Sequence, residues 1–253
     1  MEDTLVHIVS DHLTGDAPLD TAISRAILQQ VSDGDLPETL QIGRPHRVVA
    51  FGRHDAVTSG FDRAVAIAID SGFDPTIRLA GGRAVVFHEH VVRFSWTVPT
   101  PDPVRNMHAL FQVVTDSVID TLGSFEVSAT AGELPREYCP GKYSVSVRGG
   151  GKVMGSGQRL ARHASQIAGM IVVKDGASIN SVLGPVYEAL GLDMDPAATG
   201  SISDIADVDT SAVMERFARH IVGSRESIEA GIGIETSATA CEFRSDHDPR
   251  TFA

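Results

Sequence analysis

The chain has 253 residues and a formal net charge of −12, with 42% hydrophobic and 21% charged residues. This composition is ordinary for a globular protein, and the length allows one large α/β domain or two small ones. The acidic balance argues against a general nucleic-acid binder, which needs a basic face. No apolar run approaches the roughly 18 residues needed to cross a bilayer, so we expect no membrane partner.

The N-terminal residues Met1 to Thr4 lack the basic and apolar regions of a signal peptide. The two cysteines, Cys139 and Cys241, are too far apart in the sequence to indicate a disulfide framework or a zinc site. We therefore expect a cytoplasmic protein without a bound metal.

Hydrophobic periodicity predicts alternating helices and strands along one mixed α/β domain. After about residue 233 the sequence is polar, and we expect a frayed end there. The predicted elements, in chain order, are a helix at 18–31, a strand at 46–53, a β-rich stretch at 76–98 broken at Gly81-Gly82, a helix at 103–122, a strand at 166–173, and helices at 180–191 and 210–223.

Three short motifs resemble known binding loops but lack a required residue. "RGGGKV" has Ser146 where a phosphate loop has its first glycine, and no Ser or Thr follows Lys152. "HEHVVR" has Val92 where a zinc protease has its second histidine, and "GSGQRL" lacks the last glycine of a dinucleotide loop. His88 and His90 have no evident third metal ligand, so their role stays open.

The segment 137–160 combines a cysteine with a glycine-rich stretch and a lysine thirteen positions later. It is either a β-hairpin with an incidental cysteine or a nucleophile with an activating cation. A nearby cation lowers the pKa of a thiol and yields the reactive thiolate. If the two stretches pair, Lys152 is placed to activate Cys139 and to stabilise an oxyanion. Cys241, in the polar tail, is expected to be incidental.

Charge is unevenly distributed along the chain. Residues 136–163 carry a net charge of +5, and the remaining residues carry −17. An acidic protein with one basic segment indicates a localised anionic partner or substrate.

Two patterns carry a family resemblance. Arg78 is followed by Gly81 and Gly82, and Lys152 begins a Lys-x-x-Gly-x-x-Gln pattern. Together with "DAPLDTAISRAIL" and "VVAFGR" upstream, they resemble the biotin/lipoate protein ligase and octanoyltransferase family over about residues 14–175. The resemblance implies an α/β (α+β mixed) fold: one catalytic domain over 1–253, with a mixed β-sheet flanked by helices. It also implies a set of substrate-binding residues, namely Arg78, Gly81, Gly82, Ser144, Gly155, Ser156 and Gln158.

Within that family, "YCPG" at 138–141 resembles the branch of cysteine-using octanoyltransferases and amidotransferases. This implies an enzyme that moves an octanoyl or lipoyl group to the lysine of a lipoyl-carrier domain, with Cys139 and Lys152 as catalytic residues. The donor would be an acyl carrier protein or another acylated lipoyl domain. The acceptor would be the lipoyl domain of a dehydrogenase complex or a glycine cleavage H protein. This reading requires no cofactor.

Two alternatives remain at this point. One is a lipoate-protein ligase that uses ATP and Mg and acts through an adenylate; the other is a non-catalytic binder of acyl-carrier proteins. The chain departs from the ligase pattern, since Arg83 replaces a third glycine and His90 replaces another glycine. The ligase histidine falls near Phe87, so its role cannot be transferred to His88.

Overall fold

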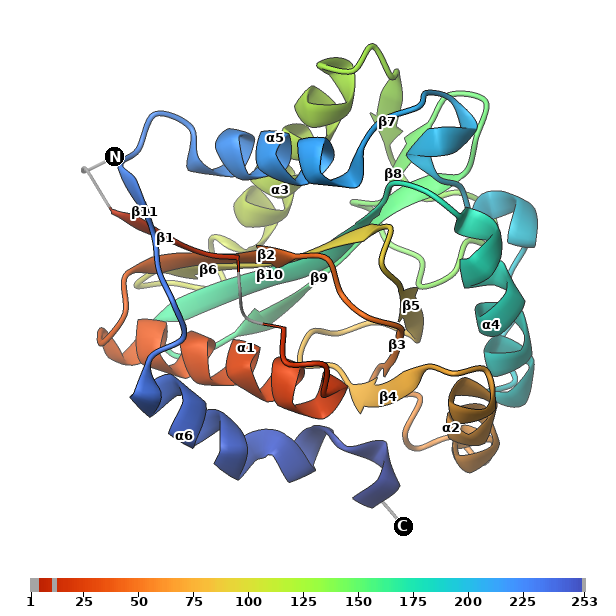
Figure 1. Cartoon of the computed structure of the whole chain (residues 1–253), viewed down its shortest axis with the longest axis horizontal. Coiled ribbons are helices and arrows are strands. Elements are labelled where there is room, and N and C mark those ends of the chain that lie inside the picture. The colour runs from red at the N-terminus through yellow and green to blue at the C-terminus, as the bar shows by residue number, and fades with distance from the viewer. Residues whose placement is uncertain (1–4, 11–12, 252–253) are drawn as a thin grey trace.

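The computed structural model describes residues 5–10 and 13–251. In this part of the chain, eight strands form one large mixed sheet in the order β11-β1-β2-β6-β10-β9-β8-β7 (Figure 1). Strand β1 is parallel to both of its neighbours, and the other pairings are antiparallel. The strands are β1 (Val6–Val9), β2 (Glu38–Gly43), β6 (Val91–Pro99), β7 (Ala129–Ala131), β8 (Val145–Val147), β9 (Lys152–Leu160), β10 (Ala164–Val172) and β11 (Ser227–Glu229).

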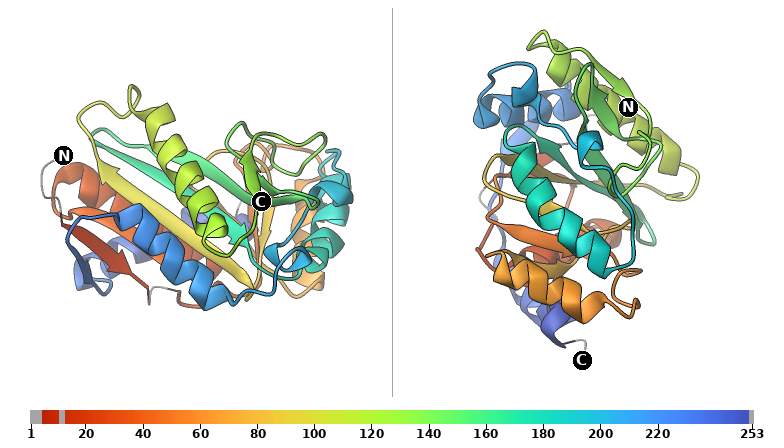
Figure 2. Two further views of the ribbon diagram at one scale, coloured as in Figure 1. Left: turned by 90° about the horizontal axis from the view of Figure 1, so that it is seen from above. Right: turned by 90° about the vertical axis from the view of Figure 1, so that its right-hand side faces the viewer.

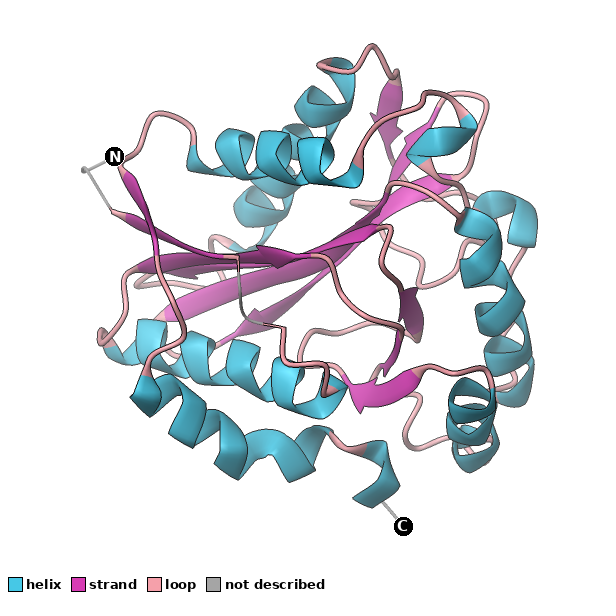
Figure 3. Cartoon of the chain, in the orientation of Figure 1, coloured by secondary structure: helices cyan, strands magenta, loops and turns pink. Residues whose placement is uncertain are grey.

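Helices cover both faces of this sheet (Figure 3). Helices α3 and α5 lie on one face, while α1 lies on the other with α6 packed outside it (Figure 1). The bounds are α1 (Ala17–Asp33), α3 (Met107–Gly123), α5 (Thr210–Val222) and α6 (Ile234–Phe243). No helix of the described residues is both long and apolar enough to cross a membrane.

A smaller sheet stands beside the large one and has its own helical cover (Figure 2). Among the described residues it has three strands, in the order β4-β3-β5, and α2 and α4 pack against each other and against this sheet. Its elements are β3 (Val48–Phe51), α2 (Phe61–Asp70), β4 (Asp74–Ile77), β5 (Val85–Phe87) and α4 (Gly176–Ala189). The space between the two sheets is where the site forms.

Strand β6, in the middle of the large sheet, shows how the two faces differ. Successive side chains of a strand point to opposite faces. Phe94 and Trp96 belong to the apolar core beneath α3 and α5. Arg93 and Ser95 therefore point to the other face, toward α1 and the small sheet. That face carries further buried polar side chains, such as Gln41 opposite Ser95.

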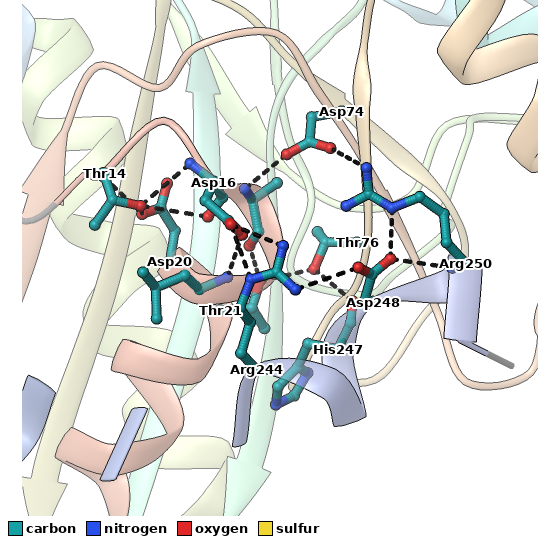
Figure 4. Close-up of polar contacts among 12 residues, drawn as sticks. Thr14, Asp16, Asp20, Thr21, Asp74, Thr76, Arg244, His247, Asp248 and Arg250 are labelled. Carbon is teal, nitrogen blue, oxygen red and sulfur yellow. Dashed lines mark hydrogen bonds and ion pairs between the residues drawn. The ribbon is translucent and has the colours of Figure 1, made fainter. Parts of the chain in front are cut away.

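The C-terminal segment is folded, whereas the sequence led us to expect a frayed end from about residue 233. Helix α6 packs on α1, and 3-10 turns follow at Arg244–His247 and Pro249–Thr251. Arg244 forms an ion pair with Asp16 at 2.8 Å, and Arg250 pairs with Asp74 at 3.5 Å (Figure 4). The charged side chains that led us to expect a solvated tail instead form ion pairs with residues at the start of α1 and of β4. Residues 252–253 lie outside the described residues.

Candidate active site

A cavity lies between the two sheets. Its walls come from β6, β9 and β10 of the large sheet, from all three strands of the small sheet, and from α1. Arg78, Cys139, Lys152 and Gly155 all line it, so the fold brings together residues that are up to 77 positions apart. The wall is mostly apolar, which suits a hydrocarbon chain.

Cys139 sits in a turn whose backbone is held in an uncommon conformation. Its φ of +42° lies in the left-handed region, which costs free energy for a residue other than glycine. The Cys139 amide donates to the Tyr187 hydroxyl at 2.7 Å, and that hydroxyl donates to the Ala84 carbonyl at 3.1 Å. Burial raises the pKa of Tyr187, so its hydroxyl remains a donor. Helix α4 thus fixes the cysteine in place.

The Cys139 sulfur has two hydrogen-bond donors. Arg78 Nη2 lies 3.1 Å from Sγ, and the backbone N–H of Arg83 lies 3.3 Å from it. Burial raises the pKa of the thiol, but the charges of Arg78 and Lys152 and these two hydrogen bonds outweigh it, and the pKa is lowered. The arrangement favours the thiolate, which is the nucleophilic form.

Gly82 is required by the close approach of Arg78 and Cys139. Its φ is +106°, and a Cβ there would lie 2.1 Å from Arg78 Nη2 and 2.7 Å from Cys139 Sγ. Gly81 is exposed, and a Cβ there would meet nothing within 4 Å. Of the two glycines that the resemblance points to, Gly82 is the one that the sulfur and the guanidinium need.

Lys152 is buried and does not touch the sulfur. Its ammonium donates to Glu137 Oε1 at 3.0 Å and to the carbonyls of Tyr138 and Cys139, both at 2.9 Å. All three N–H bonds of the ammonium therefore have acceptors. A Cβ at position 155 would lie 3.0 Å from Lys152 Cε, so Gly155 leaves room for this side chain. Lys152 acts on Cys139 through its charge and through the turn that it holds.

Glu137 is the site residue that sequence reasoning missed. Besides Lys152, its Oε1 accepts from the Ser144 hydroxyl at 2.5 Å and from the Gly141 amide at 3.1 Å. Ser144 is thus placed behind the cysteine turn, away from the cavity wall. The available signal was that Glu137 is the only acid in the basic segment and immediately precedes "YCPG".

The last two predicted site residues, Ser156 and Gln158, are both on β9. Ser156 contributes to the cavity wall, and its buried hydroxyl has no hydrogen-bond partner among the described residues. Gln158 does not line the cavity, because its strand position pairs with Ile167 in the core beneath α3 and α5. Its side-chain amide nitrogen donates to the Ser165 hydroxyl at 2.6 Å, while its backbone carbonyl accepts from the Gly81 amide at 3.5 Å. The backbone of Gln158 thus contacts the glycine loop, whereas its side chain binds Ser165.

His88 and His90 lie in the turn between β5 and β6, and they form a local pair. The His88 ring accepts from the His90 amide at 3.2 Å, and burial lowers the pKa of His88. Within residues 5–10 and 13–251, no group of three or more His, Cys, Asp or Glu side chains is placed to hold a metal.

A mostly apolar cavity between two sheets, with a cysteine and a buried lysine in its wall, is the kind of arrangement found in enzyme active sites. Residues 16–222 match the family described as the lipoyl protein ligase A/B catalytic domain. The match covers most of the chain, which therefore belongs to this family.

Curated relatives share about a quarter of their residues with the chain. An octanoyl-[GcvH]:protein N-octanoyltransferase of Bacillus velezensis is 25% identical over 201 residues, which cover 79% of this chain and 70% of that protein. A lipoyl-[GcvH]:protein N-lipoyltransferase of Listeria monocytogenes is 24% identical over 188 residues, covering 69% of this chain and 66% of that protein.

Solved structures confirm the fold. A lipoate-protein ligase A bound with ATP superposes with a TM-score of 0.77 at 18% identity, covering 95% of this chain and 94% of that one. A lipoate-protein ligase from Thermoplasma acidophilum gives a TM-score of 0.74 at 18% identity, covering 95% and 92%. The expected mixed sheet flanked by helices is thus the fold of this family.

Proposed function

We propose that the chain is an acyltransferase that moves an octanoyl or lipoyl group to the lysine of a lipoyl-carrier domain through a thioester on Cys139. The observation that carries this proposal is the Cys139 sulfur, bound by Arg78 and the Arg83 amide beside a mostly apolar cavity. The names of the Bacillus and Listeria relatives, which are octanoyl- and lipoyltransferases, support it. Residues 1–253 would act together as one catalytic domain.

The first step forms the acyl-enzyme. The Cys139 thiolate attacks the carbonyl carbon of the donor thioester, the new C–S bond forms, and the donor sulfur leaves with the electron pair of the broken C–S bond. Negative charge develops on the carbonyl oxygen during the attack. The Arg78 guanidinium and the Arg83 amide, already aimed at the sulfur, are the nearest donors for that charge.

The second step transfers the acyl group to nitrogen. The neutral amine of the acceptor lysine attacks the thioester carbonyl, the C–S bond breaks with its electron pair going to the Cys139 sulfur, and the new amide nitrogen gives up one proton to water. The same lowered pKa that makes the thiolate available also makes it a good leaving group. Lys152 keeps the turn rigid through both steps, because its ammonium binds two carbonyls of that turn.

The partners follow from this chemistry. An acylated carrier protein, either an acyl carrier protein or an acylated lipoyl domain, would supply the acyl group. A glycine cleavage H protein or the lipoyl domain of a dehydrogenase complex would receive it. The relatives' names include GcvH, which supports a small carrier protein as partner. We place the reaction in the cytoplasm, where the two unpaired cysteines would stay reduced.

The ATP-dependent ligase is the less favoured alternative. Two features of the glycine loop support transfer without a nucleotide. The position of a third glycine is occupied by Arg83, whose guanidinium pairs with the buried Asp55 at 3.2 Å. The inner side of Gly82 faces the Cys139 sulfur and Arg78, so that space is already filled.

Intact-mass analysis of the full chain tests the proposal. After incubation with an octanoyl-carrier protein and no ATP, the wild-type protein should gain one octanoyl group and should pass it to a lipoyl domain. Cys139→Ala should show neither event. Cys241→Ser is the matched control, because Cys241 is exposed on α6, and it should behave like the wild type.

Full transfer by Cys139→Ala that depends strictly on ATP would replace this proposal with the ligase. Binding of the octanoyl-carrier protein without any turnover would instead indicate a non-catalytic binder.

A further inference from the structure

A buried carboxylate lies behind the glycine loop (residues 81–83) that contacts the Cys139 sulfur. Asp55 belongs to the turn that follows β3, and its side chain is 0% exposed. Its Oδ2 accepts from the Gly52 amide at 2.8 Å, and its Oδ1 accepts from Arg83 Nη1 at 3.2 Å. The carboxylate therefore links the end of β3 to the glycine loop.

The turn that carries Asp55 is itself well fixed. The Asp55 amide donates to the Gly52 carbonyl at 3.0 Å. The amide and the hydroxyl of Thr58 both donate to the Asp55 carbonyl, at 3.0 Å and 2.8 Å. A carboxylate whose backbone is held in this way can serve as a fixed point for a neighbouring segment.

Gly82 and Arg83 share the peptide group that lies between this turn and the sulfur. A Cβ at position 52 would lie 1.8 Å from the Gly82 carbonyl oxygen, so the two backbones are in close contact. The N–H of the same peptide group is the Arg83 amide, whose nitrogen lies 3.3 Å from Cys139 Sγ. Because a trans peptide group is planar, its C=O and N–H point in opposite directions. Fixing the carbonyl side therefore also aims the N–H at the sulfur.

Asp55 acts on this peptide group from both sides. It binds Gly52, against which the Gly82 carbonyl packs, and it also binds the Arg83 side chain. Gly82 has a φ of +106°, and glycine has the greatest backbone freedom of all residues. Without these contacts, the glycine loop would be the part of the site that is easiest to displace.

The Arg83 amide matters for the ionisation of the sulfur. Burial raises the pKa of the Cys139 thiol, and the hydrogen bond from the Arg83 amide is among the interactions that lower it. A hydrogen bond weakens steeply as its angle departs from linear, so a rotation of this peptide group would weaken the contact.

We infer that Asp55 is a positioning residue of the transfer reaction, whose carboxylate holds the Gly82–Arg83 peptide group so that its N–H stays aimed at the cysteine sulfur. The catalytic consequence rests on the proposed function. The orientation of the amide can be tested on the thiol alone.

Replacing the carboxylate by an amide has two opposing effects on the sulfur. Asp55→Asn removes a negative charge, which by itself favours a thiolate and lowers the pKa of Cys139. Misplacing the Arg83 amide removes a donor from the thiolate and raises that pKa. An asparagine has one acceptor oxygen where the carboxylate has two, so it cannot hold both Gly52 and Arg83 in the present geometry. The direction of the shift therefore distinguishes positioning from charge.

The competing explanation is that Asp55 only stabilises the turn after β3. In that role it would change the free energy of unfolding, but folded Asp55→Asn protein would keep the thiol reactivity of the wild type. The pH profile of the thiol therefore separates the two explanations.

The experiment measures the rate of iodoacetamide alkylation of Cys139 across pH in the full chain, with the exposed Cys241 as internal reference. We expect Asp55→Asn to move the profile to higher pH and to lower the rate on its acidic limb about 10-fold, the factor that corresponds to one pKa unit. In transfer from an octanoyl-carrier protein, kcat should fall while KM stays within about twofold, because the buried Asp55 cannot touch the carrier.

Arg83→Met breaks the same link from its other end and should shift the profile in the same direction. Its side chain is 36% exposed, so this variant tests the inference even where Asp55→Asn does not fold. The double variant should lose about 10-fold on the acidic limb, and not the roughly 100-fold that independent effects would give. Asp193→Asn is the matched control, because it removes a carboxylate from an exposed ion pair with Arg136, and its profile should match the wild type.

An unchanged Asp55→Asn profile, or a shift to lower pH, would overturn the positioning role, as would losses that multiply in the double variant. A wild-type chain that transfers no acyl group from the carrier protein, while Asp55→Asn still shifts the alkylation profile, would overturn the proposed function. Asp55 would then remain the residue that holds the amide against the sulfur.

Discussion

At the scale of single residues, the proposed chemistry depends on the contact between Arg78 and Cys139. The sequence singles out both residues, but it assigns the activating cation to Lys152, thirteen positions from the cysteine. The structure puts Arg78, 61 positions away, in contact with the sulfur and puts Lys152 behind the turn. Sequence patterns identify residue types, whereas a contact between distant segments depends on how the sheets pack.

Replacing Arg78 should shift the pH dependence of thiol reactivity. The pKa of Cys139 is lowered in the folded protein, so wild-type Cys139 is a thiolate at a lower pH than an ordinary cysteine. Arg78→Gln removes the neighbouring charge, raises this pKa, and moves the alkylation profile to higher pH. The measurement is the iodoacetamide rate at Cys139 across pH, with Cys241 as the internal reference. An unshifted profile would show that Arg78 does not activate the sulfur.

At the scale of elements, the sequence predicts the long amphipathic helices and the buried strands. The helices expected at 18–31 and 103–122 are confirmed as α1 and α3. Helix α2 was not among the predicted elements; it has ten residues and begins after Gly60 without a side-chain cap. Strands β7, β8 and β11 have three residues each, too few to show an alternating pattern.

The first residue of β9 forms a buried ion pair that we expect to contribute to the stability of the fold. Lys152 is 1% exposed and Glu137 is 2% exposed, and Lys152 Nζ lies 3.0 Å from Glu137 Oε1. Removing one member of such a pair leaves a buried charge uncompensated and costs about 3–5 kcal/mol. We therefore expect Lys152→Met to lower the free energy of urea unfolding by about that amount. The exposed Lys142→Met should change it by less than about 0.5 kcal/mol.

The double variant Lys152→Met with Glu137→Gln separates the contribution of the ion pair to stability from that of side-chain packing. It should recover part of the lost stability, because neither charge is then left alone. If the stability losses of the two single variants add up to the loss of the double variant, the two side chains have no coupling energy.

At the scale of the whole molecule, the basic segment 136–163 does not form one patch. Arg136 is bound to Asp193 through two hydrogen bonds of 2.7 Å. Arg148 and Arg162 lie beyond opposite ends of the nine-residue strand β9, about 30 Å apart by strand rise. Lys142 is exposed on the cysteine turn itself, with its ammonium 5.5 Å from the Tyr143 ring. This is the basic residue best placed to meet an acidic carrier protein.

Lys142→Glu should therefore raise the KM for the octanoyl-carrier protein severalfold and weaken its dependence on salt, since exposed charges act mainly on association. Acylation by a small thioester should stay within about twofold, because that donor needs no docking surface. Arg162→Glu has the same charge change far from the cysteine, and its KM should stay close to the wild-type value. Equal effects of the two substitutions would show that total charge, and not local docking, matters.

The stabilised thiolate of Cys139 also determines how the protein is damaged. Thiolates are the form that peroxide oxidises, first to a sulfenic acid. A neighbouring thiol can trap that product reversibly as a disulfide, but no thiol of the described residues contacts Cys139, and Cys241 is free and exposed on α6. Further oxidation to the sulfinic acid is irreversible without a dedicated reductase. If Cys139 is the nucleophile, the same two donors that prepare its sulfur for acyl transfer also favour its oxidation, and the enzyme then needs a reductant to keep the thiol reduced.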